Sequence, residues 1–244
     1  MLTQIYEISS PDEARGVSEI GIDHVGILVG DGEFPREQPL SQAAEIAAAI
    51  AAPARFSALF LTARVDLIIE WARALQPAIV HLGTAPELLA ADQLATIKAV
   101  LPGRLIMRSV PVYGEESVRI ARSYEGVADY LLLDSHRPSD KQIGALGLPH
   151  DWSISRRIVE AVGTPVILAG GLGPNNVAQA ISIVRPAGVG HRQDDADDPE
   201  RTFAPNELDP RAARLVSLIV SRIGGMTMRA ASRGNPTSVL QDYR

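Results

Sequence analysis

The chain has no cysteine among its 244 residues. That absence excludes disulfide bonds, thiolate metal sites and a cysteine acting as nucleophile or base. Positive charge is also scarce, because 23 Lys and Arg residues stand against 29 Asp and Glu residues, giving a net charge of −6. No stretch is basic enough to follow a nucleic-acid backbone, so we expect no nucleic-acid partner.

Long apolar runs are missing as well. None approaches the roughly 20 residues that a membrane span requires, so we expect no membrane partner. The N-terminal segment "MLTQIYEISSPDEARG" lacks the charged-then-apolar pattern of a secretory signal, which makes the cytoplasm the expected location. The overall composition, 46% hydrophobic and 21% charged, is typical of a soluble globular protein with a large core.

Strand-like and helix-like segments alternate along the chain. The expected strands cover residues 3–8, 23–30, 55–62, 78–83, 104–112, 128–135, 165–171 and 187–190. The expected helices cover residues 10–20, 41–52, 64–75, 86–101, 114–126, 151–163, 174–185 and 209–223. Such alternation with short connections predicts a parallel sheet, and eight units in about 250 residues favour a single (β/α)₈ TIM barrel of the α/β class over an open sheet. We assign residues 1–225 to the barrel and 226–244 to a C-terminal tail.

Polar residues and glycines cluster where the expected strands end. In such a barrel the active site lies at the C-terminal ends of the strands. Candidate site residues are therefore Tyr6, Glu7, residues 31–36, Thr62, His81, Arg108, residues 134–136, 170–173 and 190–192.

Several of these strand ends, in barrel order, carry recognisable motifs. They are "GIDHVGILV" (21–29), "FPREQPLSQAAEI" (34–46), "ADYLLLDS" (128–135), "HDWS" (150–153), "PVILAGGLGPNNV" (165–177) and "RPAGV" (185–189). Together they resemble the phosphoribosylanthranilate isomerase family, the tryptophan-pathway barrel, over roughly residues 1–190.

The resemblance implies an Amadori rearrangement of a small phosphorylated substrate, in which a ribosylamine opens its ring and becomes a 1-deoxyribulose adduct. Such a reaction needs a general acid for the ring oxygen and a general base for the C2′ proton, and it uses no metal or other cofactor. The family's acid is an aspartate at the end of strand six, which Asp134 matches. A carboxylate that only caps the following loop is the alternative. The resemblance leaves open whether the protein is a monomer or a homodimer.

The family's base has no counterpart here. Where the family reads "K-I-C-G-L-T", this chain reads "QIYEIS" at 4–9, so Tyr6 replaces the cysteine. A phenol with a reference pKa near ~10 is mostly protonated at neutral pH. Glu7 should point to the opposite face of the strand and could serve only if the strand end bulges. His81, where the family has a glutamine, is the remaining candidate base, or else a neutral pocket residue.

The turn after the seventh strand is the candidate phosphate site. Gly170, Gly171, Leu172 and Gly173 lie between a strand and a helix, where backbone N–H groups can bind an anion. His191 and Arg192 could assist. Five acids follow between residues 194 and 200 and would repel a phosphate, unless they form a solvated loop. Their spacing matches no standard calcium loop, and we expect no metal site.

Two arginines are candidate substrate-binding residues. Arg36 stands where the family binds the anthranilate carboxylate, although a surface arginine is the alternative. Arg108 replaces a lysine common at the end of the family's strand five and could face the pocket or pair with Asp134. His136 and His150 flank a polar loop and are expected to be solvated.

Two functions follow from these residues. The first is a phosphoribosylanthranilate isomerase-like enzyme with Asp134 as acid and Tyr6, Glu7 or His81 as base. The second is a catalytically impaired barrel that binds a phosphorylated ligand or a protein partner without turnover, which the missing cysteine favours. Retention of Asp134, "HDWS" and the glycine turn favours the first.

Overall fold

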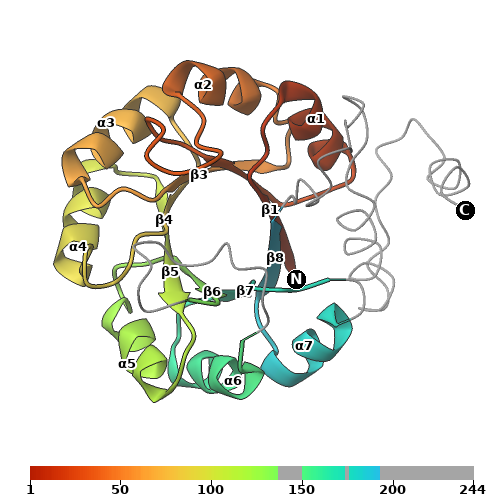
Figure 1. Cartoon of the computed structure of the whole chain (residues 1–244), viewed down its shortest axis with the longest axis vertical. Helices are drawn as coiled ribbons and strands as arrows, with labels where there is room; N and C mark the ends of the chain where they lie inside the picture. The colour runs from red at the N-terminus through yellow and green to blue at the C-terminus, as the bar shows by residue number, and fades with distance from the viewer. Residues whose placement is uncertain (137–149, 174–175, 193–244) are drawn as a thin grey trace, which may run out of the picture.

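Eight parallel strands close into one barrel, with β1 paired to β8 (Figure 1). The computed structural model describes residues 1–136, 150–173 and 176–192. Of Arg192 it describes the backbone only. The strands are β1 (Leu2–Tyr6), β2 (His24–Leu28), β3 (Arg55–Phe60), β4 (Ile79–Leu82), β5 (Leu105–Pro111), β6 (Tyr130–Asp134), β7 (Val166–Leu168) and β8 (Gly188–Arg192). The predicted (β/α)₈ fold is therefore confirmed.

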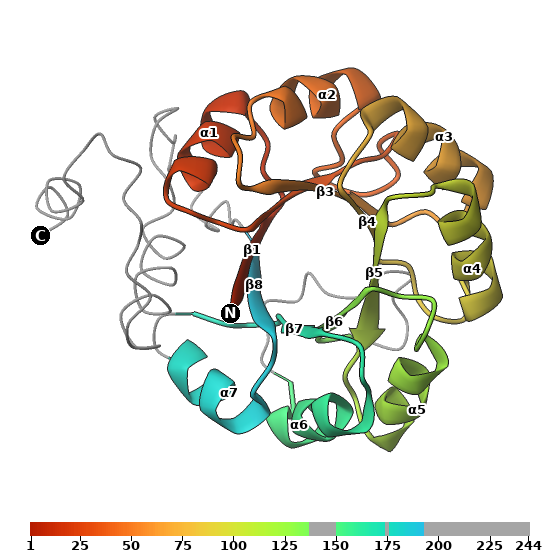
Figure 2. The ribbon, with the colours of Figure 1, turned by 180° about the vertical axis from the view of Figure 1, so that it is seen from behind.

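Helices surround the barrel in both views (Figures 1 and 2). They are α1 (Pro11–Glu19), α2 (Leu40–Ala48), α3 (Val65–Leu75), α4 (Ala91–Val100), α5 (Glu115–Ser123), α6 (Trp152–Ala161) and α7 (Val177–Val184). Within the described ranges, no helix is long and apolar enough to cross a membrane. The helix expected at 209–223 and the boundary at residue 225 fall outside the described residues and stay predictions.

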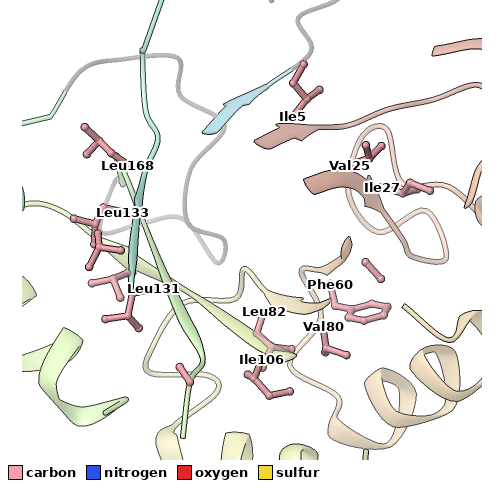
Figure 3. Close-up of a cluster of buried hydrophobic side chains, with 14 of the residues drawn as sticks. Ile5, Val25, Ile27, Phe60, Val80, Leu82, Ile106, Leu131, Leu133 and Leu168 are labelled. Atoms are coloured by element: carbon pink, nitrogen blue, oxygen red, sulfur yellow. The ribbon is translucent and has the colours of Figure 1, made fainter. Parts of the chain in front are cut away.

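The strands are buried on both faces, which explains their near-continuous apolar sequences. Outward-facing residues such as Ile5, Val25, Phe60, Leu82 and Leu133 belong to a large cluster between the barrel and its helices (Figure 3). A smaller cluster fills the lumen and comprises Tyr6, Ile79, Met107, Leu132, Ile167 and Ala169. Successive residues of a strand point alternately to the lumen and to the helix layer. A residue next to a member of one cluster therefore points toward the other cluster.

The starts of α1 and α4 show how far the local sequence fixes a helix terminus. Ser10 accepts a hydrogen bond from the Glu13 amide at 3.2 Å and Pro11 begins α1, within one residue of the expected start. The helix expected from residue 86 begins instead at Ala91. The preceding residues form a turn whose Leu89 carbonyl accepts a hydrogen bond from Arg108.

Candidate active site

Asp134 is the last residue of β6 and faces the lumen side of the barrel mouth. It has the same parity as Leu132, which belongs to the lumen cluster. Its Oδ1 accepts a hydrogen bond from the Ser135 amide at 2.7 Å. A Cβ added to Gly170 would lie 2.8 Å from this same oxygen, so the carboxylate lies directly against the turn after β7.

The turn after β7 exposes backbone donors. Gly170 and Gly171 have φ values of 81° and 60°, in the left-handed region that favours glycine. Asn176 braces the turn by accepting from the Gly173 amide at 2.8 Å and donating to the Gly171 carbonyl at 2.9 Å. The N–H groups of residues 170–172 donate to no acceptor in the described part of the chain. An anion at this turn could accept from them.

His191 braces the glycine turn through its side chain. Its Nδ1 donates to the Leu172 carbonyl at 3.0 Å, which fixes β8 against the glycine turn. The side chain of Arg192 and the acidic residues 194–200 lie outside the described residues, so their predicted parts in phosphate binding stay untested. In the described ranges, no three His, Asp or Glu side chains come together as metal ligands would.

Tyr6 crosses the barrel lumen. Its hydroxyl donates to Met107 Sδ at 3.2 Å, and Met107 lies on β5, four strands away in a ring of eight and thus on the opposite wall. Its ring lies 5.1 Å from that of His81. Burial raises the pKa of the Tyr6 phenol well above its usual value, and the negative charge of Asp134 raises it further. The geometry therefore favours a packing role for Tyr6 over that of a base.

Tyr6 also explains a glycine in β2. A Cβ on Gly26 would lie 2.3 Å from Tyr6 Cδ1, a separation that packed atoms do not reach. We expect Gly26→Ala to lower the free energy of unfolding by about 1–3 kcal/mol through overpacking. We expect Tyr6→Cys to lower it by about 2–4 kcal/mol through the cavity it leaves.

Combining the two substitutions tests this contact. In the Tyr6→Cys background, Gly26→Ala should cost less than it does alone, because the ring that it would strike is gone. Part of the cost should persist, since the added carbon also lies 3.0 Å from the Ile5 carbonyl oxygen. Urea denaturation of the four proteins measures the coupling, and strictly additive costs would contradict the lumen-crossing position of Tyr6.

His81 lies in the lumen as a neutral, enclosed residue. Its Nε2 lies 2.8 Å from Ser109 Oγ, and only 2% of the residue is exposed. Burial, with a smaller effect of the Arg108 charge, lowers the pKa of His81 to about 3. Such a weak base, enclosed in the lumen, is poorly suited to take a proton from a sugar at the mouth.

Glu7 occupies a backbone conformation that strand alternation does not anticipate. Its φ is +62°, which ends β1 and breaks the alternating pattern. Its Oε2 lies 3.0 Å from Nη1 of Arg36, which follows β2 and also has a left-handed φ of +70°. The expected substrate-binding arginine and the second candidate base therefore form an ion pair, with both side chains mostly buried.

Arg108 does not face the pocket, which corrects the expectation from the sequence. On β5 it alternates with Met107 of the lumen cluster, so its side chain enters the helix layer. Nη1 donates to the carbonyls of Leu82 at 2.8 Å and Thr84 at 2.6 Å, and Nη2 donates to that of Leu89 at 3.3 Å. The guanidinium also lies 5.1 Å from the centre of the Tyr124 ring. Arg108 therefore holds the loop between β4 and α4 against β5 by these hydrogen bonds.

His150 is not solvated as expected and belongs to the site. Its Nε2 lies 2.7 Å from Oγ of the buried Ser155, and burial lowers its pKa to about 4. A Cβ on Gly170 would lie 2.9 Å from its Nδ1. The available signal was the spacing in "HDWSIS", which returns a serine to the histidine after one helical turn.

Comparison with known proteins points to one family. The family model described as N-(5'phosphoribosyl)anthranilate (PRA) isomerase matches residues 28–190. The N-(5'-phosphoribosyl)anthranilate isomerase of Methanocella arvoryzae is 34% identical over 76% of this chain and 84% of its own length. That of Afipia carboxidovorans is 33% identical over 89% of this chain and 91% of its own length.

Solved structures of phosphoribosyl anthranilate isomerases share the fold. The phosphoribosyl anthranilate isomerase from Thermus thermophilus gives a TM-score of 0.69 at 18% identity, over 91% of this chain and 99% of that one. The one from Thermotoga maritima gives 0.68 at 22% identity, over 92% of this chain and all of that one. With the family model and the curated relatives, the conclusion is plain: this chain belongs to the phosphoribosylanthranilate isomerase family.

Proposed function

We propose that this chain isomerises a phosphorylated ribosylamine to the corresponding 1-deoxyribulose phosphate, with N-(5'-phosphoribosyl)anthranilate as the substrate indicated by the names of its relatives. The observation that carries the proposal is the contact between Asp134 and the Gly170 turn. A carboxylate beside a set of free backbone N–H groups can reach the ring of a sugar whose phosphate those groups hold.

Asp134 acts as the general acid. It gives its proton to the ribose ring oxygen, the C1′–O bond breaks, and the nitrogen lone pair forms a C1′=N⁺ iminium. A base then takes the C2′ proton, and the C–H electrons form the enolamine. Tautomerisation of the enolamine gives the C2′ ketone. Each positioned proton-transfer group typically contributes about 10²–10⁴-fold to such a reaction.

Glu7 acts as the base in place of the missing thiolate. The family has a glycine at this position, and the left-handed φ of +62° is a conformation that glycine adopts freely and glutamate does not. A non-glycine residue in this region costs about 1–2 kcal/mol. A carboxylate retained at that cost, one residue after the position of the family's base, supports a functional role.

Arg36 orients Glu7 and receives the substrate. A guanidinium has five N–H donors in a fixed fork, so it can hold the Glu7 carboxylate and still bind a second carboxylate, such as that of anthranilate. The ion pair observed here therefore fits the substrate-binding role expected from the sequence. In this proposal the Arg36 guanidinium holds both the base and the carboxylate of the substrate.

Asp134→Asn tests the proposed function. With freshly made phosphoribosylanthranilate and the loss of anthranilate fluorescence as readout, kcat should fall by about 10²–10⁴-fold, because the amide cannot donate the acid's proton. Asp66→Asn is the matched control, since Asp66 is exposed and pairs only with Arg64 among the described residues. If neither the unmodified chain nor Asp66→Asn converted the substrate while phosphate still bound at the glycine turn, the result would favour a binding protein.

A further inference from the structure

We propose that His150 is a positioning residue for the Asp134 acid, a role that rests on the function proposed above. The imidazole lies beside the Asp134 carboxyl at the Gly170 turn and completes its hydrogen bonding as the proton leaves. Three segments meet at this point: the end of β6, the residue before the Asp151 cap of α6, and the turn after β7.

The geometry places the two groups on one side of the turn. A Cβ on Gly170 would lie 2.8 Å from Asp134 Oδ1 and 2.9 Å from His150 Nδ1, so the two atoms are separated by no more than the sum of those distances. Gly170 has a φ of +81°, and any side chain there would strike both groups. Hydrogen bonds to a catalytic group are often long in the unliganded enzyme and tighten when substrate binds.

The imidazole has one nitrogen committed and one left for this role. Nε2 is held by Ser155 Oγ at 2.7 Å, while Nδ1 is buried and has no hydrogen-bond partner among the described residues. A buried polar atom without a partner is destabilising, so its retention beside a carboxyl needs an explanation. A hydrogen bond with Asp134 during turnover provides one.

Ser155 orients the ring proton of His150. When the Ser155 hydroxyl donates to Nε2, the ring proton is on Nδ1 and can donate to an oxygen of the Asp134 carboxyl. This hydrogen bond strengthens as the carboxyl ionises, because the acceptor then carries a charge, and no proton has to move within the ring. Burial lowers the pKa of His150 to about 4, although the neighbouring Asp151 charge opposes this effect in part, so the ring is neutral at neutral pH.

Two variants separate this role from simple packing. Asparagine places an amide near Nδ1 that can donate or accept, whereas phenylalanine keeps the ring shape and removes both nitrogens. We expect His150→Phe to lower kcat by up to about 10²-fold with KM little changed, the cost of misplacing a catalytic group. His150→Asn should stay within a few-fold of the unmodified protein. In an Asp134→Asn background, His150→Phe should have no further effect, and an undiminished loss there would overturn the proposal.

A readout that needs no turnover keeps this proposal separate from the proposed function. In ¹⁵N NMR of the full chain, the His150 Nδ1 resonance should show an inflection at the titration of the Asp134 carboxyl, and Asp134→Asn should abolish it. An Nδ1 resonance without that inflection overturns the role of His150 even if the protein is an active isomerase. An inflection in a protein with no isomerase activity supports the pairing and rejects only the proposed reaction.

Discussion

Replacing Glu7 with glutamine is expected to lower kcat for the isomerisation by about 10²–10⁴-fold, the usual contribution of a positioned base. The glutamine keeps the size and the backbone of Glu7 but loses the negative charge that takes up the C2′ proton. Glu7→Gly should lose as much activity, although it restores the family's own residue. Initial rates with phosphoribosylanthranilate measure both variants.

The glycine variant separates catalysis from folding. Glycine adopts the φ of +62° without strain, so relief of about 1 kcal/mol should offset the lost ion pair with Arg36. Its free energy of unfolding should therefore stay within about 1 kcal/mol of the unmodified protein.

Added formate should restore part of the activity to Glu7→Gly, whose cavity admits it, but not to Glu7→Gln. Glu45→Gln, on the exposed face of α2, is the control, and a glycine variant with full kcat would place the base elsewhere.

The barrel and the position of Asp134 could be predicted because both depend on simple periodicities. Eight repeats of strand and helix leave few alternatives to closure, and a strand's last residue lies at the mouth whichever face it takes. The bounds of the strands moved by only one to three residues in most cases. The glycine turn was equally predictable, because a buried strand, two glycines and a helix fix its geometry.

Arg108 could not be placed from the sequence for a physical reason. In "RLIMRSVPV" the residues facing the lumen and those facing the helices are both mostly apolar, so no alternation in hydrophobicity reveals which face the arginine takes. The resemblance then suggested the pocket, because relatives carry a lysine nearby. The register of β5 with β4 and β6, which only the folded chain supplies, assigns it to the helix layer.

Glu7 and His150 depended on local backbone geometry. Alternation along β1 does not extend to Glu7 because its left-handed φ breaks that pattern, and the family's glycine at this position was the one available warning. The polar loop before His150 suggested solvent, whereas the first turn of α6 brings Ser155 back to its ring. Both residues lie at positions where regular secondary structure ends or has not yet begun.

The buried guanidinium of Arg108 predicts the largest stability effect outside the site. It is fully buried, its pKa is lowered by burial, and it forms no ion pair with any carboxylate among the described residues. Three backbone carbonyls and the face of Tyr124 hold the charge in place of water. Two of those carbonyls, of Thr84 and Leu89, belong to the β4–α4 loop and accept from no backbone N–H among the described residues.

Arg108→Met is therefore expected to lower the free energy of unfolding by about 3–5 kcal/mol, although methionine fills much of the same space. The loss comes from three carbonyls that no longer receive the guanidinium's hydrogen bonds, one at the end of β4 and two in the β4–α4 loop. Arg108→Lys should recover only part of it, because one ammonium cannot reproduce the fork of the guanidinium. Urea denaturation gives the values, with Arg119→Met on the exposed face of α5 as the control that should change stability little.

A variant with unchanged stability but a raised KM would instead return Arg108 to the substrate-binding role expected from the sequence. The outward position of the side chain on β5 argues for the first result, because a residue in the helix layer can reach the substrate only through the loop that it fastens.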